Sequence, residues 1–258
     1  MDAVLLFSGQ GAQKVGMGKD LYDQYPVAKA LIEQADKALG ESLSAVMFEG
    51  PGEELTRTCN CQPALYVHGL ACLAVLKELV PSLNPVAAAG LSLGEFTAHA
   101  AAGTYSFEEG LRLVQKRGAF MEEACNATKG TMAAMIGGTD ENVIKLAQEC
   151  DVDVANFNCP GQTVVSGTEE GVAKAVAGAK AAGCKIAKKL NVAGAYHSRL
   201  MHSAMVKLAE ELKNISFGTP SMPVYCNYEA RVVEGPDDIR SMLEHQVCGS
   251  VRWTASMQ

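Results

Sequence analysis

The stretch VAAAGLSLGEFTAHAAA, residues 86–102, decides the fold of this chain. Its small apolar residues 86–89 predict a buried strand, Gly90-x-Ser92-x-Gly94 a sharp turn, and residues 95–102 a helix. This spacing is that of a nucleophile elbow, in which glycines without Cβ atoms let neighbouring chain segments come close. The hydroxyl then stands at a helix start, where backbone N–H groups favour negative charge. Ser92 is therefore our predicted nucleophile; the alternative is an ordinary strand-to-helix turn.

Outward from this stretch, strands alternate with helices. We expect a buried strand at 3–7, a helix from Pro26 to Gly40, an apolar helix at 64–79 opened by Pro63, and a helix from the capping box at 106–109 to about 123. Residues 131–190 predict strand, helix, two strands, helix and strand, the βαββαβ order of a ferredoxin-like unit. The predicted class is α/β. An α/β-hydrolase-like catalytic domain with a parallel sheet core (1–128 and 191–258) carries an inserted ferredoxin-like subdomain (129–190).

Composition excludes several classes of function. The 258 residues are 48% hydrophobic and 20% charged, an ordinary globular balance, and the net charge of −7 repels polyanions such as nucleic acid. The apolar runs are short for a bilayer and no signal peptide is evident, so no membrane partner is expected. Nine cysteines without a C-x-x-C pair indicate reduced thiols, no metal site, and a cytoplasmic location, or a plastid or mitochondrial one after processing. A monomer is expected, because no long exposed apolar stripe is evident.

A nucleophilic serine needs a base, and five histidines are available. His99 lies seven residues after Ser92 on the same helix, which places it about 10 Å along the axis. His68 is expected in the core, His202 lies inside a helix, and His245 in a polar stretch. His197 follows a Gly-Ala-Tyr loop, and loops carry catalytic groups, so it is our predicted base rather than a structural residue. No Asp between Ser92 and His197 is well placed, which predicts a dyad oriented by a backbone carbonyl or an amide side chain.

Arg117 gives a clue to the substrate. It lies four residues after Leu113 and four before Met121, so it shares the apolar face of the helix that follows residue 107. A buried guanidinium is costly without a negative partner. An internal carboxylate partner, or exposure of the charged end to water, would offset this cost. The sharper hypothesis is that Arg117 binds a free carboxylate on the substrate in a bidentate way.

A family resemblance joins these features. The segments FSGQGAQ (7–13), QPAL (62–65), GLSLGE (90–95), RG (117–118), NFNCPGQ (156–162), AYHSRLM (195–201), Gln246 and VRW (251–253) occur in this order. Over essentially its whole length, the chain resembles malonyl-CoA:acyl-carrier-protein transacylases. Ser8 and Leu91 stand where many bacterial members have proline and histidine.

The resemblance implies roles at the matching positions. Ser92 would be acylated and His197 would act as general base and acid, with Gln246 orienting it. The backbone N–H groups of Gln10 and Leu93 would form the oxyanion hole. Arg117 would bind the malonyl carboxylate, and Gln62 and Asn158 would line the site.

The resemblance also implies the reaction and its partners. Malonyl-CoA and acyl carrier protein would be the partners, with ping-pong transfer to a phosphopantetheine thiol and no cofactor of the enzyme's own. The rival hypotheses are a serine acyltransferase or hydrolase for another acyl group, and a non-catalytic scaffold. An acidic carrier needs a basic patch, for which Lys185, Lys188, Lys189 and Arg199 are candidates; the alternative is a solvated face.

Overall fold

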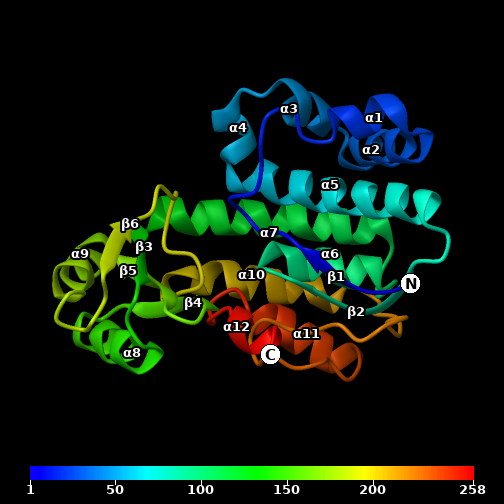
Figure 1. Ribbon diagram of the computed structural model, residues 1–258. Helices are drawn as coiled ribbons and strands as arrows, with labels where there is room; N and C mark the ends of the chain where they lie inside the picture. Colours follow the sequence, from blue (N-terminus) through cyan, green and yellow to red (C-terminus); the bar gives the residue numbers. More distant parts are fainter. The chain divides into compact units, whose positions relative to one another are not determined.

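The computed structural model describes residues 1–258 as two compact units. The first comprises Met1–Ala119, Glu211–Tyr225 and Val232–Ile239, and the second Phe120–Glu210, Cys226–Arg231 and Arg240–Gln258. The strands are β1 (Asp2–Phe7), β2 (Asn84–Gly90), β3 (Gly130–Ile136), β4 (Asp153–Cys159), β5 (Gln162–Thr168) and β6 (Ile186–Lys189). The helices are α1 (Lys19–Gln24), α2 (Pro26–Leu39), α3 (Leu43–Glu49), α4 (Gly52–Thr56), α5 (Thr58–Leu79), α6 (Leu93–Ala101), α7 (Phe107–Ala127), α8 (Asp140–Glu149), α9 (Glu169–Gly178), the 3-10 turn η1 (Arg199–Met201), α10 (His202–Lys213), α11 (Pro236–His245) and α12 (Trp253–Ser256). Figure 1 shows their arrangement within each unit.

The first unit is built on a parallel pair of strands. β1 and β2 run side by side with Phe7 opposite Gly90, and a single parallel bridge joins Ala88 to Val224 on the other side of β2. α6 packs on both strands, and α5 packs on α6 and α2. Because parallel strands end at the same edge, the loop after Phe7 and the elbow after Gly90 lie next to one another, where α/β folds place their ligands.

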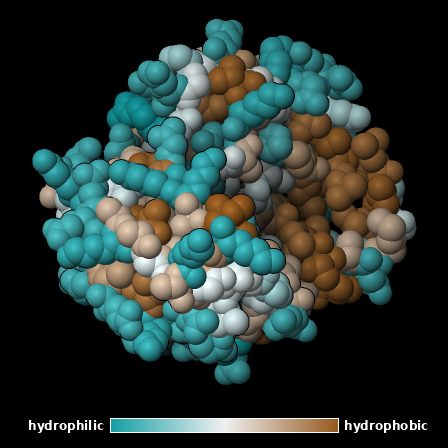
Figure 2. Space-filling model, turned by 60° about the vertical axis from the view of Figure 1, so that its left-hand side comes forward, coloured by the Kyte–Doolittle hydropathy of each residue, from teal (hydrophilic) through white to brown (hydrophobic).

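Only one face of β1 is buried. Leu5 and Phe7 are buried, whereas the alternating Val4 and Leu6 are each 55% exposed, so the expected fully buried strand is wrong. Residues of β1 and α5 line an open groove of about 380 Å³. The other exposed apolar side chains of β2 and α5 include Val86, Leu76 and Leu79. Figure 2 shows hydrophobic residues gathered over a broad area of the surface. α6 packs on the strand pair, and the exposed side chains of β1, β2 and α5 leave an apolar area uncovered.

The helix that contains Pro63 starts earlier than expected. The N–H groups of Asn60 and Cys61 both donate to Arg57 O, at 3.0 and 2.7 Å, so α5 begins at Thr58 and Pro63 lies inside it. The backbone hydrogen bonds to Arg57 therefore place the start of α5 five residues before Pro63. The sequence pattern expected this proline in the first turn, but the helix accommodates it one turn later. α5 is long and apolar enough to cross a membrane by length and composition alone, but 61% of its most apolar window is buried, as in a core helix.

The second unit contains a four-stranded antiparallel sheet in the order β4-β5-β3-β6. β3, α8, β4, β5, α9 and β6 follow one another along the chain, which is the ferredoxin-like arrangement. Thr139 and Thr168 are the N-caps of α8 and α9, and their side chains accept hydrogen bonds from the backbone of the first turn. Both helices pack on the sheet over a core that includes Met135, Leu146 and Val165. The predicted α/β class, with its parallel and its ferredoxin-like sheet, is confirmed. The domain boundaries at 128/129 and 190/191 stay a prediction.

Candidate active site

The chain reverses sharply at Ser92. β2 ends at Gly90, α6 begins at Leu93, and Ser92 between them has φ 53° and ψ −105°. A positive φ at a residue with a Cβ is strained, and such strain persists only where the surroundings enforce it. The predicted strand, turn and helix are confirmed as local structure, and the serine stands at the start of α6.

Close backbone contacts enforce this turn. A Cβ on Gly90 would lie 2.0 Å from the carbonyl carbon and oxygen of Gly94, and one on Gly94 would lie 2.3 Å from Phe7 O. A Cβ on Gly9, in the loop after β1, would lie 2.4 Å from Leu91 O. Leu91 N also donates to Phe7 O at 3.0 Å. The elbow is therefore pressed against the end of β1 and can form only with glycine at these positions.

Arg117 is the largest fully buried side chain of the molecule and is only 1% exposed. Its Nη1 donates to Gln62 Oε1 at 2.7 Å, and its Nη2 donates to Ser92 Oγ at 3.1 Å. The guanidinium carbon lies 5.1 Å from the centre of the Phe96 ring, within the range of a cation–π contact. The helix pattern placed Arg117 on the apolar face, and this placement is confirmed. The guanidinium is one hydrogen bond away from the candidate nucleophile.

Sequence reasoning missed Phe96. It lies four residues after Ser92, in the first turn of α6, and this closeness to the elbow was the signal available. Gln62, which the resemblance placed in the site, is buried and contacts Arg117 directly. Within the first unit, α5, α6 and α7 thus bring Gln62, Ser92, Phe96 and Arg117 together.

Gln10 and Leu93 lie on either side of the elbow. Leu93 is the first residue of α6, and the first N–H groups of a helix have no acceptor within it. Gln10 directly follows Gly9, whose backbone packs on Leu91. These positions are compatible with donors to an oxyanion, and that role stays a prediction.

His197 belongs to the second unit, in the loop before η1. It is 4% exposed and has φ 53°, which again is a left-handed conformation at a residue with a Cβ. Its Nδ1 lies 2.8 Å from Gln246 O. Because a carbonyl only accepts, Nδ1 carries the proton in the neutral ring and Nε2 keeps the lone pair. Gln246 thus holds His197 through its main chain, one of the two kinds of partner left open by the sequence.

The second unit also contains Asn158. It is the extra residue of a β-bulge near the end of β4, where Phe157 pairs with Thr163 and Cys159 with Gln162. Asn158 is half-buried. Bulges often re-aim a side chain next to a functional site. A role for Asn158 in lining the site stays a prediction.

Burial weakens His99 and His68 as bases. His99 is fully buried on α6 with Nδ1 3.2 Å from Thr104 Oγ1, and burial lowers the pKa of its imidazole to about 3. His68 is half-buried and burial also lowers its pKa. Burial thus favours the neutral form of both rings and makes each a weaker proton acceptor. No group of three or more His, Cys, Asp or Glu side chains is arranged to hold a metal ion.

The basic patch considered for carrier docking is smaller than expected. The guanidinium of Arg199 pairs with Asp153 at 2.8 Å and Asp151 at 2.7 Å, so its charge is locally compensated. Lys189 lies 3.5 Å from Glu169. Arg199 is therefore better described as an internal tie of the second unit than as a free cation.

Comparison with known proteins defines the class. A family model described as acyl transferase domain matches residues 4–256. The malonyl CoA-acyl carrier protein transacylase of Bacillus subtilis (strain 168) is 43% identical over 257 residues, covering 98% of this chain and 80% of the relative. The crystal structure of an acyl-carrier-protein S-malonyltransferase from Burkholderia pseudomallei 1710b has a TM-score of 0.95 at 35% identity, covering 100% of this chain and 85% of that one. A malonyl-transacylase in complex with a type II PKS acyl-carrier protein has a TM-score of 0.93 at 37% identity, covering 97% and 82%.

The elbow serine, the buried arginine and the matching family model together define an acyltransferase. Within that class, the chain belongs to the family of malonyl CoA-acyl carrier protein transacylases, as the order of its motifs indicated.

Proposed function

We propose that this chain transfers a malonyl group from malonyl-CoA to the phosphopantetheine thiol of an acyl carrier protein, for fatty acid or polyketide chain elongation. The observation that carries the proposal is the buried guanidinium of Arg117, 3.1 Å from Ser92 Oγ. A malonyl group esterified to that oxygen places its free carboxylate only one methylene beyond the ester carbonyl. The nearby guanidinium can bind such a short dicarboxylic acyl group, whereas an acetyl group offers it nothing.

The first half-reaction forms the malonyl-serine ester. Ser92 Oγ attacks the thioester carbonyl of malonyl-CoA while His197 Nε2 takes the hydroxyl proton. The N–H groups of Gln10 and Leu93 stabilise the negative oxygen of the tetrahedral intermediate. The bond to sulfur then breaks, and His197 returns the proton to the leaving thiolate, so coenzyme A departs as a thiol.

The second half-reaction reverses these roles. The phosphopantetheine thiol gives its proton to His197 and attacks the ester carbonyl, and the proton then passes to Ser92 Oγ as the serine leaves. Gln246 O, which accepts from Nδ1 at 2.8 Å, supports the positive charge that His197 carries between these steps. Gln62, and in this proposal Asn158, line the acyl site.

Acyl carrier protein as partner is supported by the related malonyl-transacylase seen with its type II PKS carrier. We further propose that the enzyme works without a cofactor of its own, in a reducing compartment such as the cytoplasm. A monomer was expected from the lack of an exposed apolar stripe, and the exposed Val4 and Leu6 of β1 count against that ground. All nine cysteines are free thiols, which supports the reducing compartment.

An intact-mass measurement tests the function. The purified protein is incubated with malonyl-CoA or acetyl-CoA, without carrier protein, beside the Ser92→Ala variant. We expect the wild-type protein to gain the mass of one malonyl group, to gain little from acetyl-CoA, and Ser92→Ala to gain neither. Adding a carrier protein with its phosphopantetheine arm then removes the adduct and transfers it to the carrier.

The rival hypotheses give different outcomes in the same assay. A hydrolase loses the adduct to water at the same rate with or without the carrier protein. An acyltransferase for another acyl group forms its adduct equally well from acetyl-CoA. A wild-type protein that gains no mass from either donor contradicts the proposal and supports a non-catalytic scaffold.

A further inference from the structure

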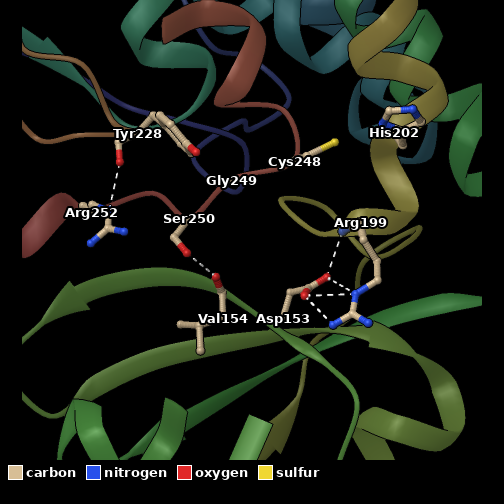
Figure 3. A pocket seen from close by; sticks show the side chains of 9 residues that line it. All are labelled: Asp153, Val154, Arg199, His202, Tyr228, Cys248, Gly249, Ser250 and Arg252. Carbon is tan, nitrogen blue, oxygen red and sulfur yellow. Dashed lines mark hydrogen bonds and ion pairs between the residues drawn. The ribbon is translucent and has the colours of Figure 1, made fainter. Parts of the chain in front are cut away.

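A multidentate contact ties the loop of His197 to strand β4. Two residues after His197, the backbone N–H of Arg199 donates to Asp153 Oδ2 at 2.8 Å. The Arg199 side chain returns to the same carboxylate, with Nη2 2.8 Å from Oδ1 and Nε 3.1 Å from both oxygens. Figure 3 shows the two side chains facing each other across these bonds. The Asp153 carboxylate therefore holds both the backbone and the side chain of Arg199.

The residue that orients His197 is attached to the same strand. Gln246 O accepts from His197 Nδ1, and the chain that follows Gln246 runs along β4. Ser250 Oγ donates to Val154 O at 2.6 Å, and Val251 N donates to Ala155 O at 2.8 Å. The first residues of β4 thus fix the imidazole from two sides, through the loop that carries it and through the segment that accepts its proton.

His197 needs such support because its backbone is strained. A left-handed φ at a non-glycine residue costs on the order of 1 kcal/mol or more, and the strain persists only when contacts nearby over-determine it. One local contact is the 2.6 Å hydrogen bond from Ser198 Oγ to Ala195 O. The Asp153 tie at Arg199 is a second contact, and it reaches across 46 positions in sequence.

Not every ion pair would matter here, because exposed pairs contribute little to stability. The side chain of Asp151 is 87% exposed and makes a single bond to Arg199 Nη1, at 2.7 Å. The side chain of Asp153 is 27% exposed, and it alone also binds the backbone N–H. Two carboxylates of equal charge thus contact one guanidinium, but only one of them holds the loop.

Asp153 supplies the acceptor for the Arg199 backbone N–H, which Asp151 does not contact. Asp153 and Arg199 form one wall of an open cavity of about 530 Å³, whose other walls include His202, Tyr228 and Cys248. Burial raises the pKa of the Cys248 thiol to about 11, so it remains protonated and cannot replace the carboxylate. Removing the Asp153 side chain would leave the Arg199 N–H without its acceptor, while Asp151 would still contact the guanidinium.

We propose that Asp153 is a positioning residue for His197: by binding the backbone N–H and the guanidinium of Arg199, it fixes the loop that orients the imidazole. The inference rests on the proposed role of His197 as the general base. It predicts that loss of Asp153 slows the chemical steps and leaves the binding of malonyl-CoA, through Arg117 in the first unit, unchanged.

Steady-state kinetics of three variants test the proposal. Asp153→Ala should lower kcat about tenfold, since small displacements of a general base are costly, with KM for malonyl-CoA within about twofold. Arg199→Ala keeps its N–H on Asp153 and should lose only about threefold in kcat. Asp151→Ala, the matched control that removes an equal charge from the same guanidinium, should stay within about twofold of wild type. Equal losses in the two aspartate variants, or none in Asp153→Ala, would overturn it.

A spectroscopic signature separates this proposal from the proposed function. In protein with ¹⁵N-labelled histidine, the His197 signals, assigned by their absence in His197→Gln, should show the Nδ1–H tautomer. Asp153→Ala should mix the tautomers, and Asp153→Asn, which keeps an acceptor for the Arg199 N–H, should largely restore the wild-type spectrum and also serves if the alanine variant folds poorly. Unchanged His197 signals in Asp153→Ala contradict the positioning role. This reading holds even if the wild-type protein transfers no malonyl group, a result that would contradict only the proposed function.

Discussion

Replacing Arg117 by alanine should convert a malonyl-selective enzyme into one with little preference between malonyl and acetyl groups. In the wild-type structure Nη2 already donates to Ser92 Oγ at 3.1 Å, so an acyl group on that oxygen lies beside a guanidinium that is almost fully buried. Hydrogen bonds to charged groups contribute about 1.5 to 3 kcal/mol each. A bidentate contact would supply about 3 to 6 kcal/mol, from which the lost hydration of the carboxylate must be subtracted.

A remainder of about 3 kcal/mol corresponds to roughly a hundredfold in rate. We therefore expect Arg117→Ala to lower the rate of Ser92 acylation by malonyl-CoA about a hundredfold. The rate with acetyl-CoA should change by no more than about threefold, because acetyl has no carboxylate to lose. Both donors present the same coenzyme A and the same thioester, so general damage from the cavity left by the side chain cancels in the ratio of the two rates.

The assay is a competition of malonyl-CoA and acetyl-CoA for one sample of enzyme, quenched within the first turnover and weighed as the intact protein. Arg117→Lys is the informative companion, because it keeps the positive charge and loses the planar pair of donors. It should fall between the wild-type protein and Arg117→Ala. A ratio that stays at the wild-type value while both rates fall together would refute the carboxylate contact and leave Arg117 as a structural residue.

Two further predictions concern the fold around the site. Gly90→Ala should lower Tm by about 10 °C or prevent folding, because its Cβ would lie 2.0 Å from backbone atoms of Gly94. Gly103→Ala, at a glycine with φ +75° but with nothing within 4 Å of the added Cβ, should lower Tm by only about 3 °C. Equal drops in Tm for Gly90→Ala and Gly103→Ala would contradict the view that close backbone contacts enforce the elbow. The second prediction concerns His99, whose pKa burial lowers from 6.5 to about 3. As the pH falls, His99 is therefore protonated in the unfolded chain before it is protonated in the folded protein. The unfolding free energy that His99 contributes above pH 6.5 is lost as the pH falls toward 3. Between about pH 7 and pH 5.5, the unfolding free energy measured by urea titration should drop by about 1 kcal/mol more in the wild-type protein than in His99→Gln. Equal drops of the unfolding free energy in the two proteins would exclude His99 as the cause.

The sequence predicts the elbow and Arg117 well because both signals are local. Three residues within five positions encode the turn at Ser92, and a spacing of four along a single helix places Arg117 on the buried face. The ferredoxin-like order of strands and helices likewise follows from patterns within single segments. These features need only the geometry of one element and its ends, which sequence patterns describe directly.

Other features depend on what lies across the fold. The resemblance names Gln246 as the residue that orients His197, but the contact is made by its main-chain carbonyl, which no side-chain type marks in the sequence. Val4 and Leu6 look like core residues, and only the tertiary arrangement shows that one face of β1 stays open. Helix α11 was not anticipated, although Pro236 followed by two aspartates is a recognisable helix start.

The two candidate catalytic residues share a strained backbone, with φ 53° at both Ser92 and His197, but they are held in different ways. At Ser92 the constraint comes from main-chain atoms packed against glycines. Because main-chain atoms cannot move aside by a rotamer change, substitutions at Gly90 or Gly94 should prevent or destabilise folding. At His197 the constraint comes from side chains such as Asp153, which can be shortened or neutralised one contact at a time. Substitutions around the histidine should therefore give graded losses of kcat in folded protein. Since strain is retained only where the structure enforces it, the serine is fixed by the fold and the histidine by a set of contacts that selection can adjust.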